Sequence, residues 1–293
     1  GNLTMGGGDH TGKLTAGQIQ VQGNFLQTSS GSATSFAASG AHTTIFTSSG
    51  STTFQSPGAA ASHFHHLVVV GNLTLLSRAV ATGDVTVAGD LTLNGRTLEV
   101  LGAFATQGAG ATITMTNAAD SAIISGDATF NGGNELGKMS AGTLLLGGNL
   151  TQQATISGDA FHPSGSHLTV LTGANPSLSF ATPGNVPGTS HFEQVRWTGT
   201  GTMTLATAVF AHGTFDGNPG ISGSISSAGN SLQVAHFVGG GATLSSTRLV
   251  LDGSAGGPLA LSNVTFNGLP SSATQLTVNH PGTGAPFSFS NLT

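Results

Sequence analysis

Short segments in which apolar and polar residues alternate recur along the whole chain, and glycine separates them. In GDVTVAGDLTLNGRTLEVLGAF, the glycines Gly83, Gly89, Gly95 and Gly102 are spaced by 6, 6 and 7 positions. Alternation places two apolar residues on one face of a strand, with Thr or Glu on the opposite face. The pairs are Val85 and Val87, Leu91 and Leu93, and Leu98 and Val100. No apolar stripe with helical period is present, and glycine recurs too often for a helix.

Strands this short, joined by Gly-Asp or Gly-Asn corners, are typical of a chain that turns after every strand and stacks its turns in register. The pattern therefore predicts an all-β protein, a β-solenoid or parallel β-helix. Hairpins in a sandwich would favour two-residue Asn-Gly or Asp-Gly loops, which have the opposite order. Sixteen Phe, one Trp and no Tyr fit a narrow core, since Phe has no hydroxyl that needs a partner. In 28–66, Ser- and Gly-rich links predict wider turns or a flap beside the coil.

The chain repeats itself at an offset of about 125 residues. LTAGQIQVQGNFLQ (14–27) matches MSAGTLLLGGNLTQ (139–152), and FAASGAHTTIF (36–46) matches FHPSGSHLTVL (161–171). Further along, SHFHHLVV (62–69) matches SHFEQVRW (190–197), and the offset grows to 136 by ATFNG and VTFNG. A fixed internal period indicates a repeat architecture.

These matches predict tandem β-solenoid modules of about 125–136 residues. Residues 2–13 align with 127–138, and 1–13 are interpreted as the tail of a preceding module. Module 1 then covers 14–138 and module 2 covers 139–268. The divergent segment 269–293 continues the solenoid or caps it. The chain opens at Gly1 with no charged and apolar leader, so we expect an upstream part that could carry a signal peptide.

Charge and cysteine content narrow the classes of function. Asp, Glu, Lys and Arg make up 6% of the residues, against about 25% in typical soluble domains. Six basic against eleven acidic residues argue against a nucleic-acid partner. No window supplies the ~20 apolar residues of a transmembrane helix. The absence of cysteine rules out disulfide and thiolate chemistry and fits a bacterial surface protein as well as a cytosolic one.

Histidine is the first candidate for chemistry. His42 and His167 recur at the offset of 125, and His63, His65 and His66 lie near His42 in the sequence. Such a group could hold a metal or provide a general base. However, His65 and His66 become Glu193 and Gln194 in module 2, so no ligand set is kept. We therefore interpret His42 and His167 as corner residues that bond a backbone carbonyl, and expect no metal and no cofactor.

Carboxylates are the second candidate, because many parallel β-helix proteins cleave polysaccharides with clustered acids. Here Asp84 and Asp90 follow glycine, and Asn72 and Asn149 occupy the same slot elsewhere. A turn side chain that caps its own backbone tolerates this exchange, whereas a catalytic acid would not. We interpret these four residues as structural corners and expect no catalytic residue and no enzymatic activity.

Three weaker patterns have a structural interpretation as well. GGGDHTGK (6–13) lacks the full spacing of a phosphate loop or a calcium repeat. TITMT (112–116) resembles the Thr ladders of ice-binding solenoids only in scattered places. Asn2, Asn72, Asn149, Asn263 and Asn291 lie in N-x-T sequons, and their glycosylation depends on the host.

The phrases AGQIQVQGNFLQ, SFAASGAHTTIF, GDVTVAGDLTLNGRTLEVLGAF and VTFNGLPSSATQLTVNHPG resemble repeat modules of large secreted bacterial surface proteins. The resemblance covers nearly all of the chain, but its motifs are glycines, corners and core positions. It implies β-solenoid stalks in an extracellular, cell-surface setting, mostly without an assigned activity. It transfers no functional residue.

The sequence therefore predicts an extracellular structural protein, a rigid stalk or adhesin shaft or a subunit that self-assembles head-to-tail into filaments. The alternative is a module that binds cell-surface polysaccharide, for which Trp197 is the obvious sugar-stacking candidate. A carbohydrate-active β-helix enzyme comes third and would need a groove with two or more carboxylates.

Overall fold

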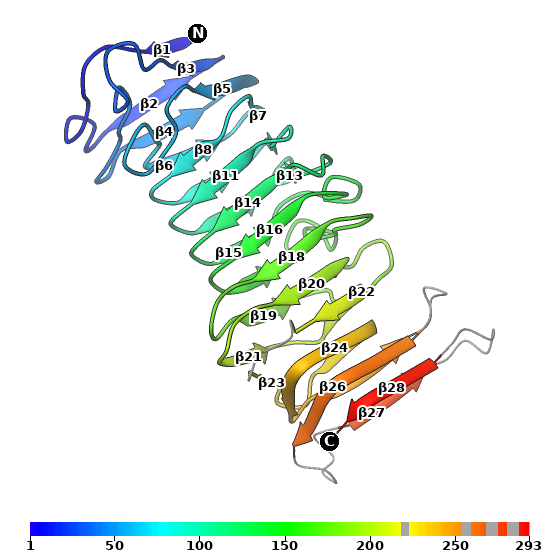
Figure 1. Cartoon of the computed structure of the whole chain (residues 1–293). Helices are drawn as coiled ribbons and strands as arrows, with labels where there is room; N and C mark the ends of the chain where they lie inside the picture. The colour runs from blue at the N-terminus through cyan, green and yellow to red at the C-terminus, as the bar shows by residue number, and fades with distance from the viewer. Residues whose placement is uncertain (218–222, 253–258, 268–274, 280–286, 293) are drawn as a thin grey trace.

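The computed structural model describes residues 1–217, 223–252, 259–267, 275–279 and 287–292. The chain is all-β and winds into a stack of about 11 turns in which strands pair in parallel. Figure 1 shows these turns following one another from the N-terminus to the C-terminus as one elongated column. The predicted fold class is confirmed.

The strands of the solenoid form three columns on different sides of the coil. Column A contains β1 (Leu3–Met5), β3 (Phe25–Gln27), β5 (Gly50–Phe54), β7 (Leu73–Leu75), β10 (Asp90–Thr92) and β13 (Thr112–Thr114). Column B contains β8 (Ala79–Ala81), β11 (Thr97–Val100), β14 (Ser121–Ile124), β16 (Thr143–Leu146), β18 (Leu168–Leu171) and β20 (Gln194–Trp197). Column A ends at β13, and column B begins at β8.

Column C contains β2 (Gln18–Val21), β4 (Thr43–Phe46), β6 (His66–Val69), β9 (Val85–Val87), β12 (Phe104–Gln107), β15 (Ala128–Asn131), β17 (Leu150–Gln152), β19 (Ser177–Phe180), β21 (Thr202–Leu205) and β23 (Ser224–Ser226). The last turns have longer strands: β22 (Val209–Asp216), β24 (Ser231–Ser245), β25 (Arg248–Asp252), β26 (Leu259–Asn267), β27 (Gln275–Asn279) and β28 (Phe287–Leu292). Strand β24 pairs with β22 through its first half and with β23 through its second half, so it covers more than one side of a turn.

Strand formation follows the alternation that the sequence displays. In β9 and β11 the apolar positions are buried, while Thr86 and Glu99 between them are partly exposed. The corners are glycine because successive turns approach too closely there for a side chain. A Cβ on Gly89 would collide with the carbonyl oxygen of Gly71 on the preceding turn.

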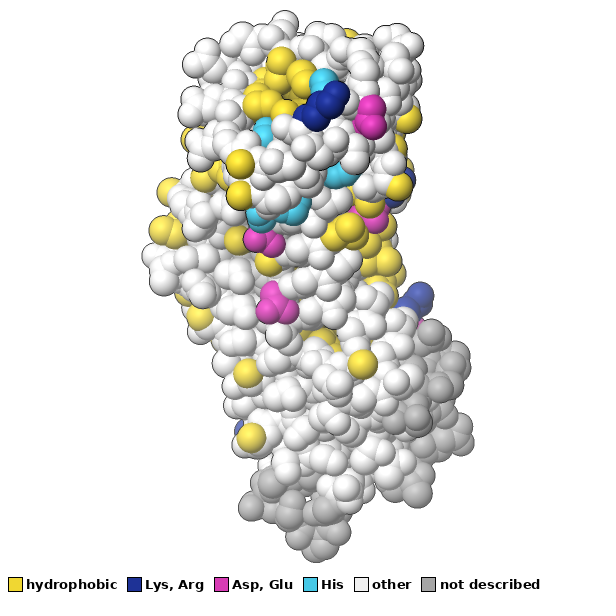
Figure 2. All heavy atoms as spheres, turned by 90° about the vertical axis from the view of Figure 1, so that its left-hand side faces the viewer, with side chains coloured by type: hydrophobic (Ala, Val, Ile, Leu, Met, Phe, Trp, Pro, Cys, Tyr) yellow, Lys and Arg dark blue, Asp and Glu magenta, His cyan; other side chains and the backbone are white. Residues whose placement is uncertain are grey.

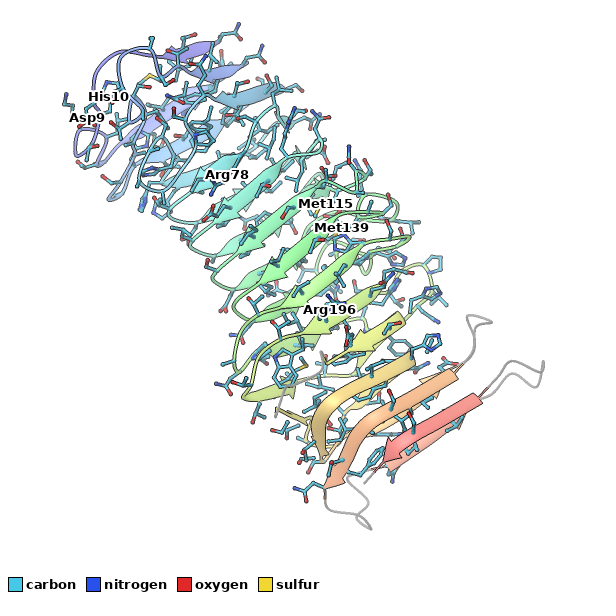
Figure 3. The ribbon with its side chains drawn as sticks, in the orientation of Figure 1. Asp9, His10, Arg78, Met115, Met139 and Arg196 are labelled. Atoms are coloured by element: carbon cyan, nitrogen blue, oxygen red, sulfur yellow. The ribbon has the colours of Figure 1, made fainter. Side chains whose placement is uncertain are left out.

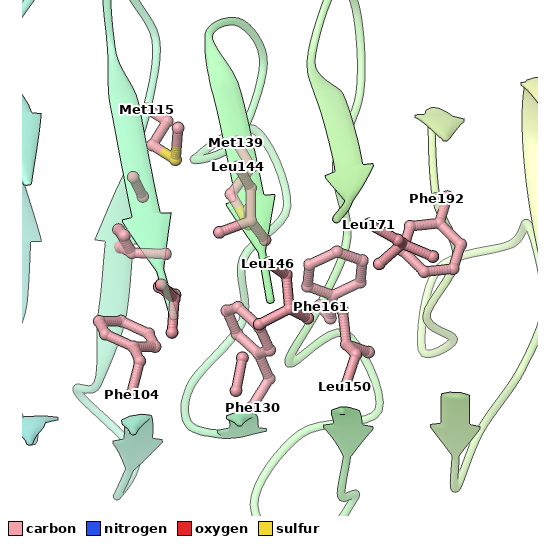
Figure 4. Packing of buried hydrophobic residues seen from close by; sticks show 14 of the residues in the cluster. Phe104, Met115, Phe130, Met139, Leu144, Leu146, Leu150, Phe161, Leu171 and Phe192 are labelled. Atoms are coloured by element: carbon pink, nitrogen blue, oxygen red, sulfur yellow. The ribbon is translucent and has the colours of Figure 1, made fainter. Parts of the chain in front are cut away.

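The core is one continuous row of apolar side chains inside the coil. Phe161 illustrates the packing: its ring lies 4.7 Å from that of Phe130 and 5.4 Å from that of Phe192, measured between centroids. Met115 and Met139 meet on adjacent turns, as Figures 3 and 4 show. The expectation that most Phe residues form the core is confirmed within the described part. The buried ones are Phe25, Phe36, Phe46, Phe54, Phe64, Phe104, Phe130, Phe161, Phe180, Phe192, Phe215 and Phe237.

The two copies of the sequence repeat place their matching strands on different sides of the solenoid. Strand β2 of module 1 belongs to column C, whereas its sequence counterpart β16 belongs to column B. Likewise β3 lies in column A and its counterpart β17 in column C. One module therefore does not complete a whole number of turns, and matching residues face neighbouring sides of the coil. Within 269–293, β27 and β28 continue the parallel pairing, and 269–274, 280–286 and 293 lie outside the described residues.

Candidate functional site: a histidine-rich side of the coil

Histidines of module 2 gather on successive turns beside the loop 181–189. The rings of His162 and His191 meet edge to face, with centroids 4.3 Å apart and planes at 69°. The ring of His212 on the next turn lies 6.2 Å from that of His191. His162 and His191 are 6% and 4% exposed, so this pair is packed within the protein rather than presented to solvent.

Carbonyl and carboxylate oxygens fix these rings. The Nδ1 atom of His162 lies 2.8 Å from the carbonyl oxygen of Thr189 and 3.3 Å from Oδ1 of Asp159. Both are acceptors at neutral pH, so Nδ1 carries a proton and donates. The Nδ1 atom of His191 donates to the carbonyl oxygen of Gly184 at 3.0 Å by the same reasoning.

The environment of His191 keeps its ring neutral. Burial lowers the pKa of His191 to about 4, and the neighbouring His162 ring acts in the same direction. At the outer end, Nδ1 of His212 lies 3.2 Å from Oε2 of Glu193. The arrangement places one neutral buried ring between two rings that each face a carboxylate. Such a cluster stores no proton on its central member at pH 7.

Module 1 has a related but different histidine group. The rings of His65 and His66 are 4.4 Å apart, and Nδ1 of His65 lies 3.0 Å from Oγ1 of Thr82. His66 accepts the N–H of Asp84 on its Nδ1 at 3.1 Å. Burial lowers the pKa of His65, and the neighbouring His66 ring adds to the effect. Among the described residues, no three His, Asp or Glu side chains are placed to hold a metal ion together.

The two corner histidines are buried, at 2% for His42 and fully for His167. The Nδ1 atom of His167 donates to the carbonyl oxygen of Ala141 at 3.0 Å. Nδ1 of His42 has no hydrogen-bond partner among the described residues; its ring instead lies edge-on to Phe36, with centroids 6.1 Å apart. Burial lowers the pKa of His42, and lowers that of His167 to about 4. The two copies therefore use the same position with different ring contacts.

The Asp and Asn side chains at the corners accept hydrogen bonds from backbone N–H groups of the next turn. Oδ1 of Asp84 accepts the N–H of Ala103 at 2.8 Å, and Oδ1 of Asn149 accepts the N–H of Ser177 at 2.8 Å. Asp127 likewise accepts the N–H of Asn149. The expectation that these side chains cap their own backbone is wrong, because the acceptor serves the next turn. Asp and Asn exchange freely since either offers the same oxygen.

Asp90 and Asn72 differ from these corners. Asp90 lies within β10 and accepts hydrogen bonds from the hydroxyls of Thr92, Thr112 and Thr114, at 2.7, 2.5 and 2.8 Å. These bonds hold the pKa of Asp90 below its ordinary value, although burial opposes them. At Asn72 the backbone takes part, because the N–H of Gly50 donates to its carbonyl oxygen at 2.9 Å. The side chains of Asn263 and Asn291 lie outside the described residues.

Sequence reasoning missed Glu135, a fully buried carboxyl. Its Oε1 accepts the N–H of Ile113 at 2.9 Å, and its Oε2 has no hydrogen-bond partner within the described part of the chain. Burial raises the pKa of Glu135 well above its usual value. The carboxyl replaces the carbonyl that a further strand of column A would offer to β13. In the sequence, Glu135 stands out only because the repeat aligns it, within NGGNELGK, with His10 of GGGDHTGK.

Trp197, which the sequence analysis names as a candidate for sugar stacking, lies inside the coil. Trp197 is fully buried and its Nε1 donates to the carbonyl oxygen of Gly173 at 3.2 Å. The interpretation of Trp197 as a surface sugar-stacking residue is therefore wrong. Long side chains outside pair across turns: Arg78 with Glu99, and Nε of Arg196 with Oδ2 of Asp216 at 2.9 Å. Arg78 and Arg196 both lie along the column of turns in Figure 3.

The chain was compared with family models, curated proteins and solved structures, and none of them matches it. In the described part of the chain, no helix has the length and hydropathy to cross a bilayer.

Proposed function

We propose that the protein is a structural element of a bacterial surface, an extracellular β-solenoid that serves as a stalk or as a subunit of a self-assembling filament. The observation that carries the proposal is the continuous parallel pairing from β2 to β28 in one sheet, which is wound around one apolar core. Such a column resists bending because every turn bonds to two neighbours. The resemblance to repeat modules of secreted bacterial surface proteins supports the location.

The end turns supply the contacts for assembly. Within the described residues β1 pairs only with β3 and β2 only with β4, so the other backbone edge of each can pair with a further turn, either of a preceding segment of the same chain or of another copy. Leu3, Met5 and Ile19 lie against the core at this end and stay partly exposed. Figure 2 shows hydrophobic side chains gathered at the end of the molecule that carries these strands. An edge with exposed apolar groups is a template for further strands.

The occupant that we propose for this edge is the last turn of another copy. Strands β27 and β28 each have one partner among the described residues, β25 and β26 respectively. Contacts between unlike ends do not close, so they extend into a filament. With about 11 turns and ~4.8 Å per turn, one copy adds about 50 Å of length.

Electron microscopy of the purified chain tests the proposal. We expect uniform fibres with an axial repeat near that length. Ile19→Lys places a charge on the free edge and should leave single short rods, whereas Leu101→Lys, on an exposed side-facing residue, should leave the fibres unchanged. Single rods for the unaltered chain would overturn filament assembly and leave a stalk. Globular particles without an elongated axis would overturn both.

A further inference from the structure

A cavity of about 140 Å³ opens beside His63 in the first turns of the coil. Its walls include Thr11, Thr34, Ala37, Ser39, Ala61 and His63. The loop that carries Asp9, His10 and Thr11 forms its outer side, at the edge of the first turns in Figure 3. A dry cavity of ~150 Å³ in a protein interior can hold a benzene ring, so this one has room for a single small ring.

Module 2 shows what fills the corresponding position there. The repeat places Ala37 opposite His162, Thr34 opposite Asp159, and His63 opposite His191. The local backbone agrees, since the N–H of His63 donates to the Phe36 carbonyl and that of His191 to the Phe161 carbonyl.

The groups that hold the His162 ring all have counterparts in the cavity wall. In module 2 that ring contacts His191, Asp159 and the Thr189 carbonyl. The counterparts of these three groups, His63, Thr34 and Ala61, all line the cavity of module 1. The cavity is thus the space of an imidazole ring that Ala37 does not supply.

We propose that this cavity is a binding site for a small planar nitrogen heterocycle of the imidazole class. The ring packs against His63, as His162 packs against His191. The ligand is either a free heterocycle or a histidine side chain of another polypeptide.

The wall offers hydrogen-bond acceptors to an N–H of such a ring. The carbonyl oxygen of Ala61 accepts from Nδ1 of His63 at 3.0 Å, and a carbonyl oxygen has a second lone pair for another donor. Thr34 takes the place of Asp159, and its hydroxyl donates to Oδ1 of Asp9 at 2.6 Å. The hydroxyl of Ser32 lies 2.8 Å from the hydroxyl oxygen of Thr34 and takes one of its lone pairs, which leaves the second lone pair of Thr34 as an acceptor. His63 is held in a fixed tautomer, because its Nδ1 faces the carbonyl oxygens of Ala61 and Gly58.

Side-chain NMR of the full chain, with ¹³C-labelled histidine, tests the site. Imidazole should shift the ring signals of His63 in a saturable way and leave those of His191 unchanged. N-acetyl-histidine methylamide is the second probe: if it binds too, the natural ligand is a peptide histidine, and if only imidazole binds, it is a free heterocycle. No saturable shift at His63 with either probe would overturn the proposal.

Matched variants locate the site. Ala37→His should fill the cavity from within and weaken imidazole binding at His63 at least tenfold, whereas Ala37→Ser keeps the space and should bind normally. His162→Ala should open a second cavity, so that the His191 signals also respond. If either variant is unfolded by circular dichroism, the double variant Ala37→His with His162→Ala conserves the number of rings and should transfer the response from His63 to His191. Equal binding by Ala37→His and Ala37→Ser would show that the site lies elsewhere and would overturn the proposal.

Discussion

His167 should make the solenoid lose stability as the pH falls. Its ring is fully buried, and burial lowers its pKa to about 4, against ~6.5 in an unfolded chain. A histidine with a lowered pKa in the folded state contributes its full stability above ~6.5 and loses it as the pH falls toward 4. Each pKa unit corresponds to ~1.4 kcal/mol. Between pH 7 and pH 5 this single ring should therefore remove about 2 kcal/mol of unfolding free energy.

The variant His167→Asn isolates this effect. The asparagine amide nitrogen can take the place of Nδ1 and donate to the Ala141 carbonyl, but it does not titrate. We expect the variant to be less stable than the native chain at pH 7 by ~1 kcal/mol, through lost packing. Between pH 7 and pH 5 it should lose about 2 kcal/mol less than the native chain does. His191 stays in both proteins, so its contribution cancels.

Urea unfolding at both pH values measures the difference. The fully buried Trp197 reports unfolding by fluorescence, since its strand β20 pairs with β18, the strand that His167 precedes. Leu101→Asn is the matched control, because Leu101 is exposed and the change neither adds nor removes a titratable group, so it should leave the pH dependence unchanged. The same loss in His167→Asn as in the native chain would refute the assignment of acid sensitivity to His167.

Three further outcomes follow from the packing. Glu135→Gln should raise the free energy of unfolding at pH 7 and leave it unchanged near pH 4. A carboxyl whose pKa is raised in the folded state contributes stability at low pH, and this contribution is lost as the pH rises through the folded pKa. A variant that is less stable than the native chain in urea at pH 7 would contradict burial as the cause of the raised pKa. Asp127→Asn should keep the bond from the N–H of Asn149 and the melting temperature, whereas Asp127→Ala should cost ~1 kcal/mol; equal melting of the two variants would argue against the cap between turns. Phe161→Ala should cost ~3–5 kcal/mol in urea unfolding, against less than ~0.5 kcal/mol for the exposed Leu136→Ala, and a similar cost for both would show that the Phe161 ring is not a core contact.

Much of the fold could be predicted from local patterns. The alternation in 83–104 encodes which residues face inward, because a strand has a period of two that any pleated segment obeys. The Gly-Asp and Gly-Asn corners indicate where the chain turns. What each corner side chain bonds could not be predicted, since Asp84 reaches Ala103 on the next turn. A contact between turns depends on how many residues one turn holds, and that number varies with the loops.

The residues of the candidate site could likewise be predicted only in part from the sequence. Repetition of His42 and His167 was visible in the sequence, but one ring packs against Phe36 and the other donates to a carbonyl. Glu135 was missed because nothing local marks a carboxyl as buried; it is buried at the end of column A, where it accepts the N–H of Ile113 in β13. Trp197 was named as a candidate for sugar stacking, and its inward position follows from the alternation in β20, where Val195 and Trp197 are buried while Gln194 and Arg196 are exposed.

By itself the sequence determined the strand period, the apolar core and the internal repeats, since each is a property of neighbouring residues or of direct repetition. Only the tertiary structure decided which residues meet. The module does not fill a whole number of turns, so β2 and its counterpart β16 lie in different columns. The tertiary structure also shows that Ala37, which occupies the repeat position of His162, leaves a cavity beside His63. Whether a small residue leaves a cavity depends on the residues packed around it, and here those residues come from three separate segments of the chain.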